Sequence, residues 1–164
     1  MTKYYLLGFV LNLMLLQSCS KNELIEIEEQ NNLSISVSDN TQTEFENELF
    51  DLINAHRISI GLNELVFEST SYYYANEHTD FMIANGSLSH ENFSARAEQI
   101  AAKTGAKDIS ENVAKDYNSP QEALSAWLNS SKHRINLEGN YTHSALSVKP
   151  NNLGELYFTQ IFIR

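Results

Sequence analysis

The sequence predicts an α+β fold in a single domain. Apolar residues recur at helical spacing in several segments, short extended segments separate them, and two β-branched and aromatic stretches close the chain. A length of 164 residues suits one domain, and 42% hydrophobic residues are enough for a buried core. We therefore expect helices interleaved with a few strands, ending in a hairpin.

The first half of this domain is predicted to hold three helices. Residues 43–46 carry a capping-box pattern, and apolar residues follow at helical spacing over 45–60. A second helix is expected over 69–85 with Ser69 as its cap, and a shorter third over 95–103. The stretch 65–67 is short and bulky, which fits either a brief strand or a packed turn.

The second half is predicted to add one helix and most of the sheet. Residues 109–114 read as extended, and Ser119-Pro120-Gln121-Glu122 carries the signals of a helix start, with a capping serine and a proline at the first helical position. The segments 144–148 and 156–163 flank turn-forming residues at 150–154, so they predict a closing β-hairpin.

The N-terminal segment has the character of a targeting signal. An apolar run of secretory length, too short to span a bilayer, leads into Leu16-Gln17-Ser18-Cys19, which resembles a bacterial lipobox. We expect a lipoprotein signal peptide at 1–18, a lipidated Cys19 with a flexible polar tether over 19–43, and the folded domain at 44–164. An ordinary signal peptide with a chance cysteine is the alternative.

The charge and the cysteine content limit the kinds of partner that this chain can bind. The net charge of −10 repels nucleic-acid phosphates, so no nucleic-acid partner is expected. Attachment to the membrane would come from acyl chains such as palmitate on Cys19, and several chains anchor stably where one does not. Because Cys19 is the only cysteine, the domain has no internal disulfide and depends on its core. Ser20, in place of the aspartate that retains lipoproteins in the inner membrane, favours the outer membrane of a two-membrane cell.

A set of polar motifs runs through the domain in a characteristic order. The motifs are Asn54-Ala55-His56-Arg57, Ser89-His90, Glu111-Asn112, Trp127 with His133-Arg134, His143, and the segment from Tyr157 to Phe162. This order resembles the CAP superfamily, also called SCP, which includes cysteine-rich secretory proteins, venom antigens and pathogenesis-related proteins. The resemblance covers about residues 45–162 and is closest to the cysteine-poor bacterial branch. It implies an α-β-α sandwich, with an antiparallel sheet between helical layers and one cleft lined by histidines and acids.

The resemblance implies a cleft set of His90, Glu111 and His143. His90 and Glu111 match the first histidine and the first acid of the family, and His143 matches the second histidine. The second acid of many animal and plant members has no counterpart, because neutral residues follow Trp127. Asn112 and His133 are secondary candidates, and a mechanism that needs two carboxylates is not expected.

Three chemical roles remain open for this set. His90 and His143, with Glu111, could hold Zn²⁺ or another divalent metal and leave a position for water. Glu111 could instead act as a general base beside an imidazole. In the third interpretation, Glu111 is a structural group, hydrogen-bonded in a tight loop with the histidines arranged around it.

The leading functional hypothesis is a monomeric lipoprotein of the bacterial cell envelope that acts as a binding module. Its partner would be a lipid, another apolar small molecule, or an envelope or host protein. A metal-assisted hydrolase is the alternative, and a stable scaffold with its partner surface away from the cleft is a third. The remaining histidines are assigned by position: His56 to packing at a helix end, His78 to the core, and His133 either to capping backbone carbonyls or to the cleft.

Overall fold

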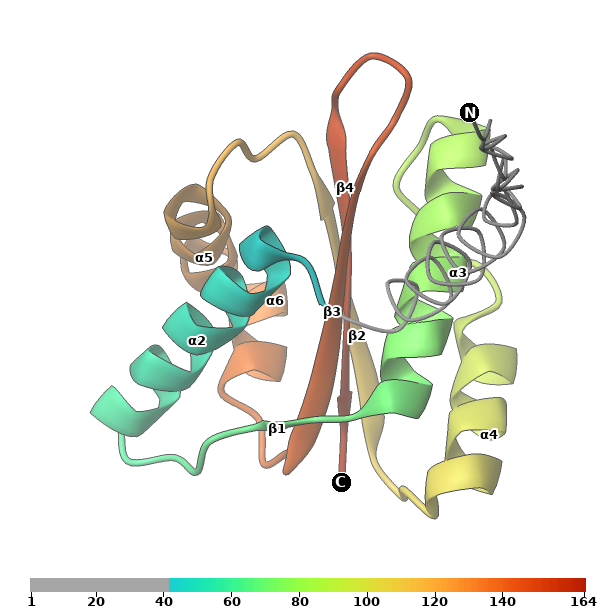
Figure 1. Cartoon of the computed structure of the whole chain (residues 1–164). Helices are drawn as coiled ribbons and strands as arrows, with labels where there is room; N and C mark the ends of the chain where they lie inside the picture. Colours follow the sequence, from blue (N-terminus) through green and yellow to red (C-terminus); the bar gives the residue numbers. More distant parts are fainter. Residues whose placement is uncertain (1–41) are drawn as a thin grey trace, which may run out of the picture. The chain divides into compact units, whose positions relative to one another are not determined.

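The computed structural model describes residues 42–164, which form three layers with a sheet between two sets of helices (Figure 1). The predicted signal peptide at 1–18, Cys19 and nearly all of the predicted tether at 19–43 lie outside the described residues. In chain order the elements are α2 (Glu44–Ser59), β1 (Val66–Phe67), α3 (Ser69–Asn85), α4 (Phe93–Thr104), β2 (Ile109–Lys115), α5 (Pro120–Asn129), α6 (Ser131–Leu137), β3 (His143–Pro150) and β4 (Leu156–Ile163). No helix within residues 42–164 is both long enough and apolar enough to cross a bilayer.

The sheet has the strand order β1-β3-β4-β2. β3 and β4 form the predicted hairpin, and β2 pairs antiparallel with β4 along its whole length. β1 is a two-residue strand that pairs parallel with the start of β3, so the sheet is mixed rather than purely antiparallel. The predicted α+β class is confirmed. Helices α2, α5 and α6 cover one face, and α3 and α4 cover the other (Figure 1).

Local capping chemistry sets the helix boundaries. Thr43 and Glu46 form the predicted reciprocal capping box at the start of α2, and the Ser119 hydroxyl accepts a hydrogen bond from the backbone N–H of Glu122 at the start of α5. The predicted cap of α3 is wrong by one residue: Glu68 is the N-cap, and its carboxylate accepts from the first backbone N–H groups of the helix. A carboxylate is favourable there because it also meets the positive end of the helix dipole.

The core lies on both faces of the sheet, because side chains alternate along each strand. Phe158 and Phe162 of β4 face α2 and α5, where they join the cluster that contains Trp127. Ile161 faces the opposite side and packs with Ile100 of α4. The two faces together give the domain its buried apolar volume without a disulfide.

Two buried charged side chains tie distant segments together. The carboxylate of Glu46, a residue only 1% exposed, accepts hydrogen bonds from the backbone of Thr43 at 2.7 Å, the hydroxyl of Tyr72 at 3.0 Å and the backbone of Val148 at 2.6 Å. Arg57 is fully buried at the end of α2, and burial lowers the pKa of its guanidinium. Its N–H groups donate to backbone carbonyls of Asn63, Leu137, Gly139 and Tyr141, and to the side-chain oxygen of Asn63.

Candidate functional site

Glu111 lies at the centre of a polar cluster between the sheet and helices α3 and α4. It belongs to the edge strand β2, and its side chain is 1% exposed. One carboxylate oxygen, Oε2, accepts from Nε of Arg96 at 2.9 Å and from Nη2 at 2.7 Å. The other, Oε1, lies 2.9 Å from Nδ1 of His90. Both oxygens therefore have a partner, and the negative charge is compensated inside the fold.

Arg96 supplies the compensating charge and was missed by the sequence analysis. It lies on the buried face of α4, is 8% exposed, and also donates to the backbone carbonyl of Glu91 at 3.1 Å. The available signal was its spacing: Arg96 precedes Ile100 by four residues, so both lie on the same inner stripe of one helix. An arginine on an inner stripe implies a buried acceptor, and Glu111 is that acceptor.

Two histidines approach the same carboxylate in different ways. The ring of His90 is 57% exposed and is the part of the cluster that faces solvent. His78 is 3% exposed, as its predicted core position requires, and its Nε2 lies 2.6 Å from the backbone oxygen of Ser89 and 3.7 Å from Oε1 of Glu111. Since a carbonyl oxygen only accepts, Nε2 of His78 carries a proton. Burial lowers the pKa of His78, although the charge of Glu111 partly opposes that effect.

Asn112 and His133 lie beside this cluster, at the junction of β2 and α6. The side chain of Asn112 donates to the backbone oxygen of His133 at 3.1 Å, and Asn136 donates both to Oδ1 of Asn112 and to the backbone oxygen of Glu111. Burial lowers the pKa of His133, and repulsion from His90 lowers it further. A hydrogen bond with the backbone of Val113 raises this pKa but is outweighed. The two secondary candidates thus hold α6 against the strand that carries Glu111.

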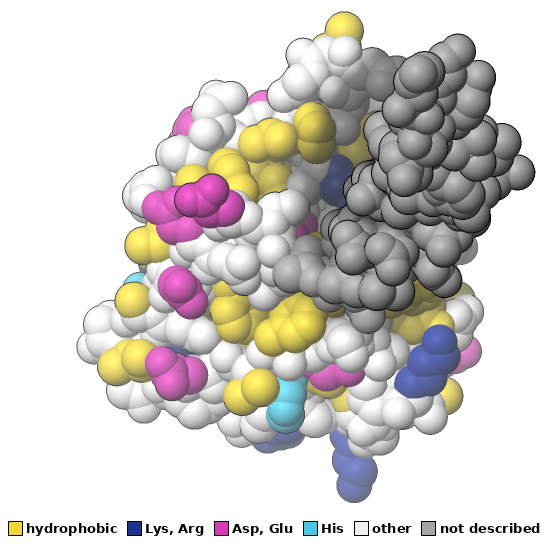
Figure 2. Space-filling view, viewed as in Figure 1, with side chains coloured by type: hydrophobic (Ala, Val, Ile, Leu, Met, Phe, Trp, Pro, Cys, Tyr) yellow, Lys and Arg dark blue, Asp and Glu magenta, His cyan; other side chains and the backbone are white. Residues whose placement is uncertain are grey.

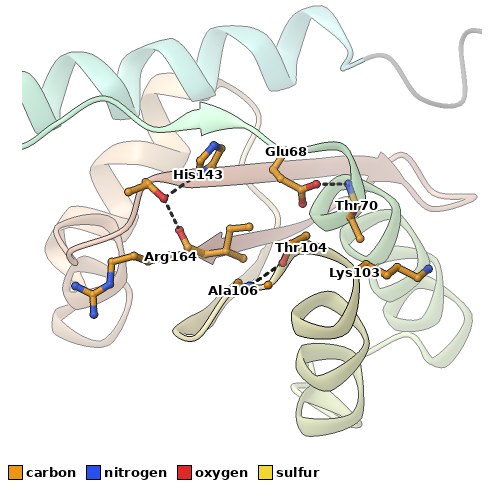
Figure 3. A pocket seen from close by; sticks show the side chains of 10 residues that line it. Glu68, Thr70, Lys103, Thr104, Ala106, His143 and Arg164 are labelled. Carbon is orange, nitrogen blue, oxygen red and sulfur yellow. Dashed lines mark hydrogen bonds between the residues drawn. The ribbon is translucent and has the colours of Figure 1, made fainter.

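His143 lies elsewhere, in a separate pocket near the end of the sheet (Figure 3). Glu111 of β2 pairs with Ile161 of β4, and Ile161 pairs in turn with Ala145 of β3. His143 therefore lies two strands away from Glu111 and two residues from Ala145 along β3. Standard sheet spacings put the two Cα atoms roughly 12 Å apart. The structure therefore brings together His90 and Glu111 but does not bring His143 to them. Within residues 42–164, no group of three or more histidine, cysteine, aspartate or glutamate side chains has an arrangement that could hold a metal ion.

The contacts of the cluster favour a fixed, compensated charge on Glu111 over proton transfer by this carboxylate. A general base needs a carboxylate oxygen that can reach a substrate proton. Glu111 is buried, one oxygen accepts two hydrogen bonds from Arg96, and the other lies 2.9 Å from Nδ1 of His90, with Nε2 of His78 3.7 Å away. The exposed part of the cluster is the imidazole of His90, which can accept or donate a hydrogen bond at the surface.

Two pockets lie away from this cluster. One has a volume of about 360 Å³ and is lined by His143, Glu68 and residues from the end of α4 (Figure 3). The other, of about 350 Å³, lies between α2 and α5 and is lined by Leu52, Leu124 and Leu128 together with three polar residues. Both volumes are at the small end of the range for small-molecule sites.

Comparisons with known proteins agree on the fold. The model of the cysteine-rich secretory protein family, CAP, matches residues 50–162. The uncharacterized membrane protein YlbC of Bacillus subtilis strain 168 is 31% identical over 127 residues, which are 75% of this chain and 35% of YlbC. An extracellular protein of Bacillus anthracis that contains an SCP domain superposes with a TM-score of 0.64 at 29% identity, over 73% of this chain and 40% of that one.

An outer surface protein of Borrelia burgdorferi superposes with a TM-score of 0.65 over 76% of this chain and 98% of that one. Its identity is only 19%, so this likeness speaks for the fold alone. The chain spans about 35% of the length of YlbC and 40% of the Bacillus anthracis chain.

Proposed function

The chain belongs to the cysteine-rich secretory protein (CAP) family, and we propose that it is a binding module displayed on the bacterial cell envelope. The resemblance to this family that the sequence motifs predicted is confirmed. The ligand we propose is a neutral lipid or other apolar small molecule, bound in the groove between α2 and α5.

The groove itself is the observation that carries this proposal. A pocket of about 350 Å³ that is open to solvent is lined by Leu52, Leu124 and Leu128. Hydrophobic and acidic side chains lie side by side over α2 and α5 on the face drawn in Figure 2. Covering apolar surface contributes about 25 cal/mol for each Å² removed from water, so an apolar ligand would gain from filling this space.

The rim of the groove argues for a neutral ligand. Gln121 of α5 donates a hydrogen bond of 2.5 Å to the carboxylate of Glu48 on α2, which bridges the two helices. Glu48 is exposed, and α5 carries one acidic residue and no basic one. A ligand with a carboxylate would therefore meet a negative charge at the rim, whereas an alcohol or ester would not.

The alternative, a metal-assisted hydrolase that uses His90, Glu111 and His143, has less support. That mechanism needs the three side chains around one centre, and His143 lines a pocket whose lining includes neither His90 nor Glu111. Glu111 is also committed to Arg96 through two hydrogen bonds. The structural interpretation of Glu111 agrees better with these contacts.

Attachment to the envelope rests on the N-terminal sequence and on the relatives. Leu16-Gln17-Ser18-Cys19 has the lipobox pattern, and the relatives include an extracellular protein and a membrane protein. We propose that acyl chains on Cys19 hold the domain at the membrane, in the outer membrane if the cell has two. Cells fed radiolabelled palmitate should label the wild-type chain and leave Cys19→Ser unlabelled; equal labelling of both would contradict lipidation at this residue.

Displacement of a fluorescent fatty alcohol from the purified full-length chain tests the groove. Leu52→Glu places a charge in the groove at a residue outside the main core cluster, so we expect binding to weaken by about tenfold or more. Leu153→Glu is the matched control, because Leu153 is 83% exposed at the tip of the β3–β4 hairpin. Equal binding by both variants and the wild type would refute the groove as the site. A matching fluorescent fatty acid should bind more weakly than the alcohol.

A further inference from the structure

We propose that the pocket around His143 is a second site, and that it binds a neutral saccharide. This His143 pocket lies where the start of β3, the end of β4, the start of α3 and the end of α4 meet (Figure 3). Its lining combines hydroxyl, carboxylate, ammonium and imidazole groups with small apolar ones; the residues that matter here are Glu68, Thr70, Lys103, Thr104, His143 and Ile163. The site is independent of the groove between α2 and α5.

Thr142 occupies one ring nitrogen of His143 and leaves the other for a ligand. The Thr142 hydroxyl oxygen lies 2.8 Å from Nδ1 of His143, and the same hydroxyl lies 3.4 Å from the backbone oxygen of Ile163. The second ring nitrogen, Nε2, donates in one tautomer and accepts in the other. A ligand hydroxyl can pair with Nε2 in either case, because a hydroxyl both donates and accepts.

The charged residues in the lining are Glu68, Lys103 and Arg164. Glu68 is held by the backbone N–H groups of Thr70 and Ser71; burial alone would raise its pKa, but these hydrogen bonds outweigh burial and lower it. Lys103 lies 5.0 Å from the ring centre of Tyr74 and 5.8 Å from that of Tyr73, and hydrogen bonding with Tyr74 raises the pKa of Lys103. The ammonium of Lys103 thus lies over these rings and points away from the pocket (Figure 3), and the guanidinium of Arg164 pairs with Asp108. The charge that the pocket presents is therefore the carboxylate of Glu68.

This lining favours a neutral ligand with many hydroxyl groups. A phosphate would be repelled by Glu68, and a divalent metal would find only two suitable ligand side chains, His143 and Glu68, in the lining. Sugar hydroxyls both donate and accept, so they can pair with the imidazole of His143, the carboxylate of Glu68 and the hydroxyl of Thr70. Ala106 and Ile163 offer an apolar wall for the C–H face of a ring. A volume of about 360 Å³ accommodates a ligand of this size.

The test is an NMR titration of the full-length, isotope-labelled chain in a detergent without a sugar headgroup. The probes are glucose, N-acetylglucosamine, maltose and N,N′-diacetylchitobiose at millimolar concentrations, with inorganic phosphate for comparison. We expect at least one sugar to cause saturable shifts in the backbone amides of Gly105 and Ala106. His143→Phe should weaken this binding by about tenfold, because it removes the hydrogen-bonding nitrogen Nε2. His56→Phe is the matched control, since His56 is also half-buried but pairs with Glu138 far from the pocket.

Each other outcome counts against the proposal. Absence of saturable shifts with every sugar overturns it, as does sugar binding that His143→Phe leaves unchanged. Binding of phosphate in place of sugars would assign the pocket to anions. If the amide spectrum shows that His143→Phe does not fold, Thr70→Val provides the same test at another lining residue, with weaker sugar binding expected.

Discussion

Removing the cation beside Glu111 should destabilise the domain strongly. In Arg96→Met, the carboxylate of Glu111 stays 1% exposed but loses hydrogen bonds of 2.9 Å and 2.7 Å, and keeps only His90 and the more distant His78. Breaking a buried ion pair by removing one partner costs about 3–5 kcal/mol, because a charge is left uncompensated. For a domain of this size, that loss corresponds to a fall in Tm of roughly 12–20 °C.

Urea unfolding followed by circular dichroism measures this loss, and a second substitution tests its cause. Adding Glu111→Gln to Arg96→Met removes the stranded charge, so the double variant should recover about 2 kcal/mol relative to Arg96→Met. Lys149→Met is the matched control. It breaks an ion pair of similar length, 2.7 Å to Asp80, but the two side chains are 33% and 57% exposed and so stay in contact with water, and a change within about 0.5 kcal/mol is expected.

A loss below about 1 kcal/mol for Arg96→Met, with cooperative unfolding intact, would refute the structural role of the pair. Strictly additive effects of Arg96→Met and Glu111→Gln on the unfolding free energy would also refute this role, because the two side chains would then not depend on each other. Either result would restore Glu111 as a candidate for chemistry.

Three further predictions concern stability. Arg57→Lys reduces five N–H donors to three, so about two buried carbonyls lose their partners and unfolding free energy should fall by about 2–4 kcal/mol in urea titrations. Because the folded pKa of His78 lies below its unfolded value of about 6.5, its contribution to stability is complete above that pH and is lost as the pH falls further, through the folded pKa. His78→Phe should flatten the acid side of the stability profile measured by thermal unfolding. Ser119→Ala removes the cap of α5 and should cost about 1 kcal/mol by the same urea assay, while Ser119→Asp should retain most of it.

The fold could be predicted from sequence because its signals are local. Residues 43–46 and Ser119 mark helix starts by chemistry that acts within one turn, and the hairpin is marked by a turn between two β-prone segments. The one wrong cap, at Ser69, arose because Glu68 is a less common capping residue than serine. Whether β1 pairs at all depends on its two-residue contact with β3, which no local pattern encodes.

The candidate site could be predicted only in part, because its members come from different elements. His90 and Glu111 were identified from the family motifs, and the structure gives them a shared hydrogen bond. Arg96 and His78 were overlooked as site residues, because on sequence alone a residue of an inner helical stripe cannot be distinguished from ordinary core. His143 carries a motif position but sits two strands away from Glu111, a distance set by sheet register.

The buried carboxylate of Glu46 has a mechanical consequence. It lies in the first turn of α2 and is bonded at once to the entry of the domain, to α3 and to the strand β3. When the chain is pulled from its N-terminal side, the Glu46 side chain would transmit the force to all three segments at once. Helix α2 would therefore not unwind turn by turn. Extension under force should therefore begin with a single abrupt step, and Glu46→Gln should lower the force at which that step occurs.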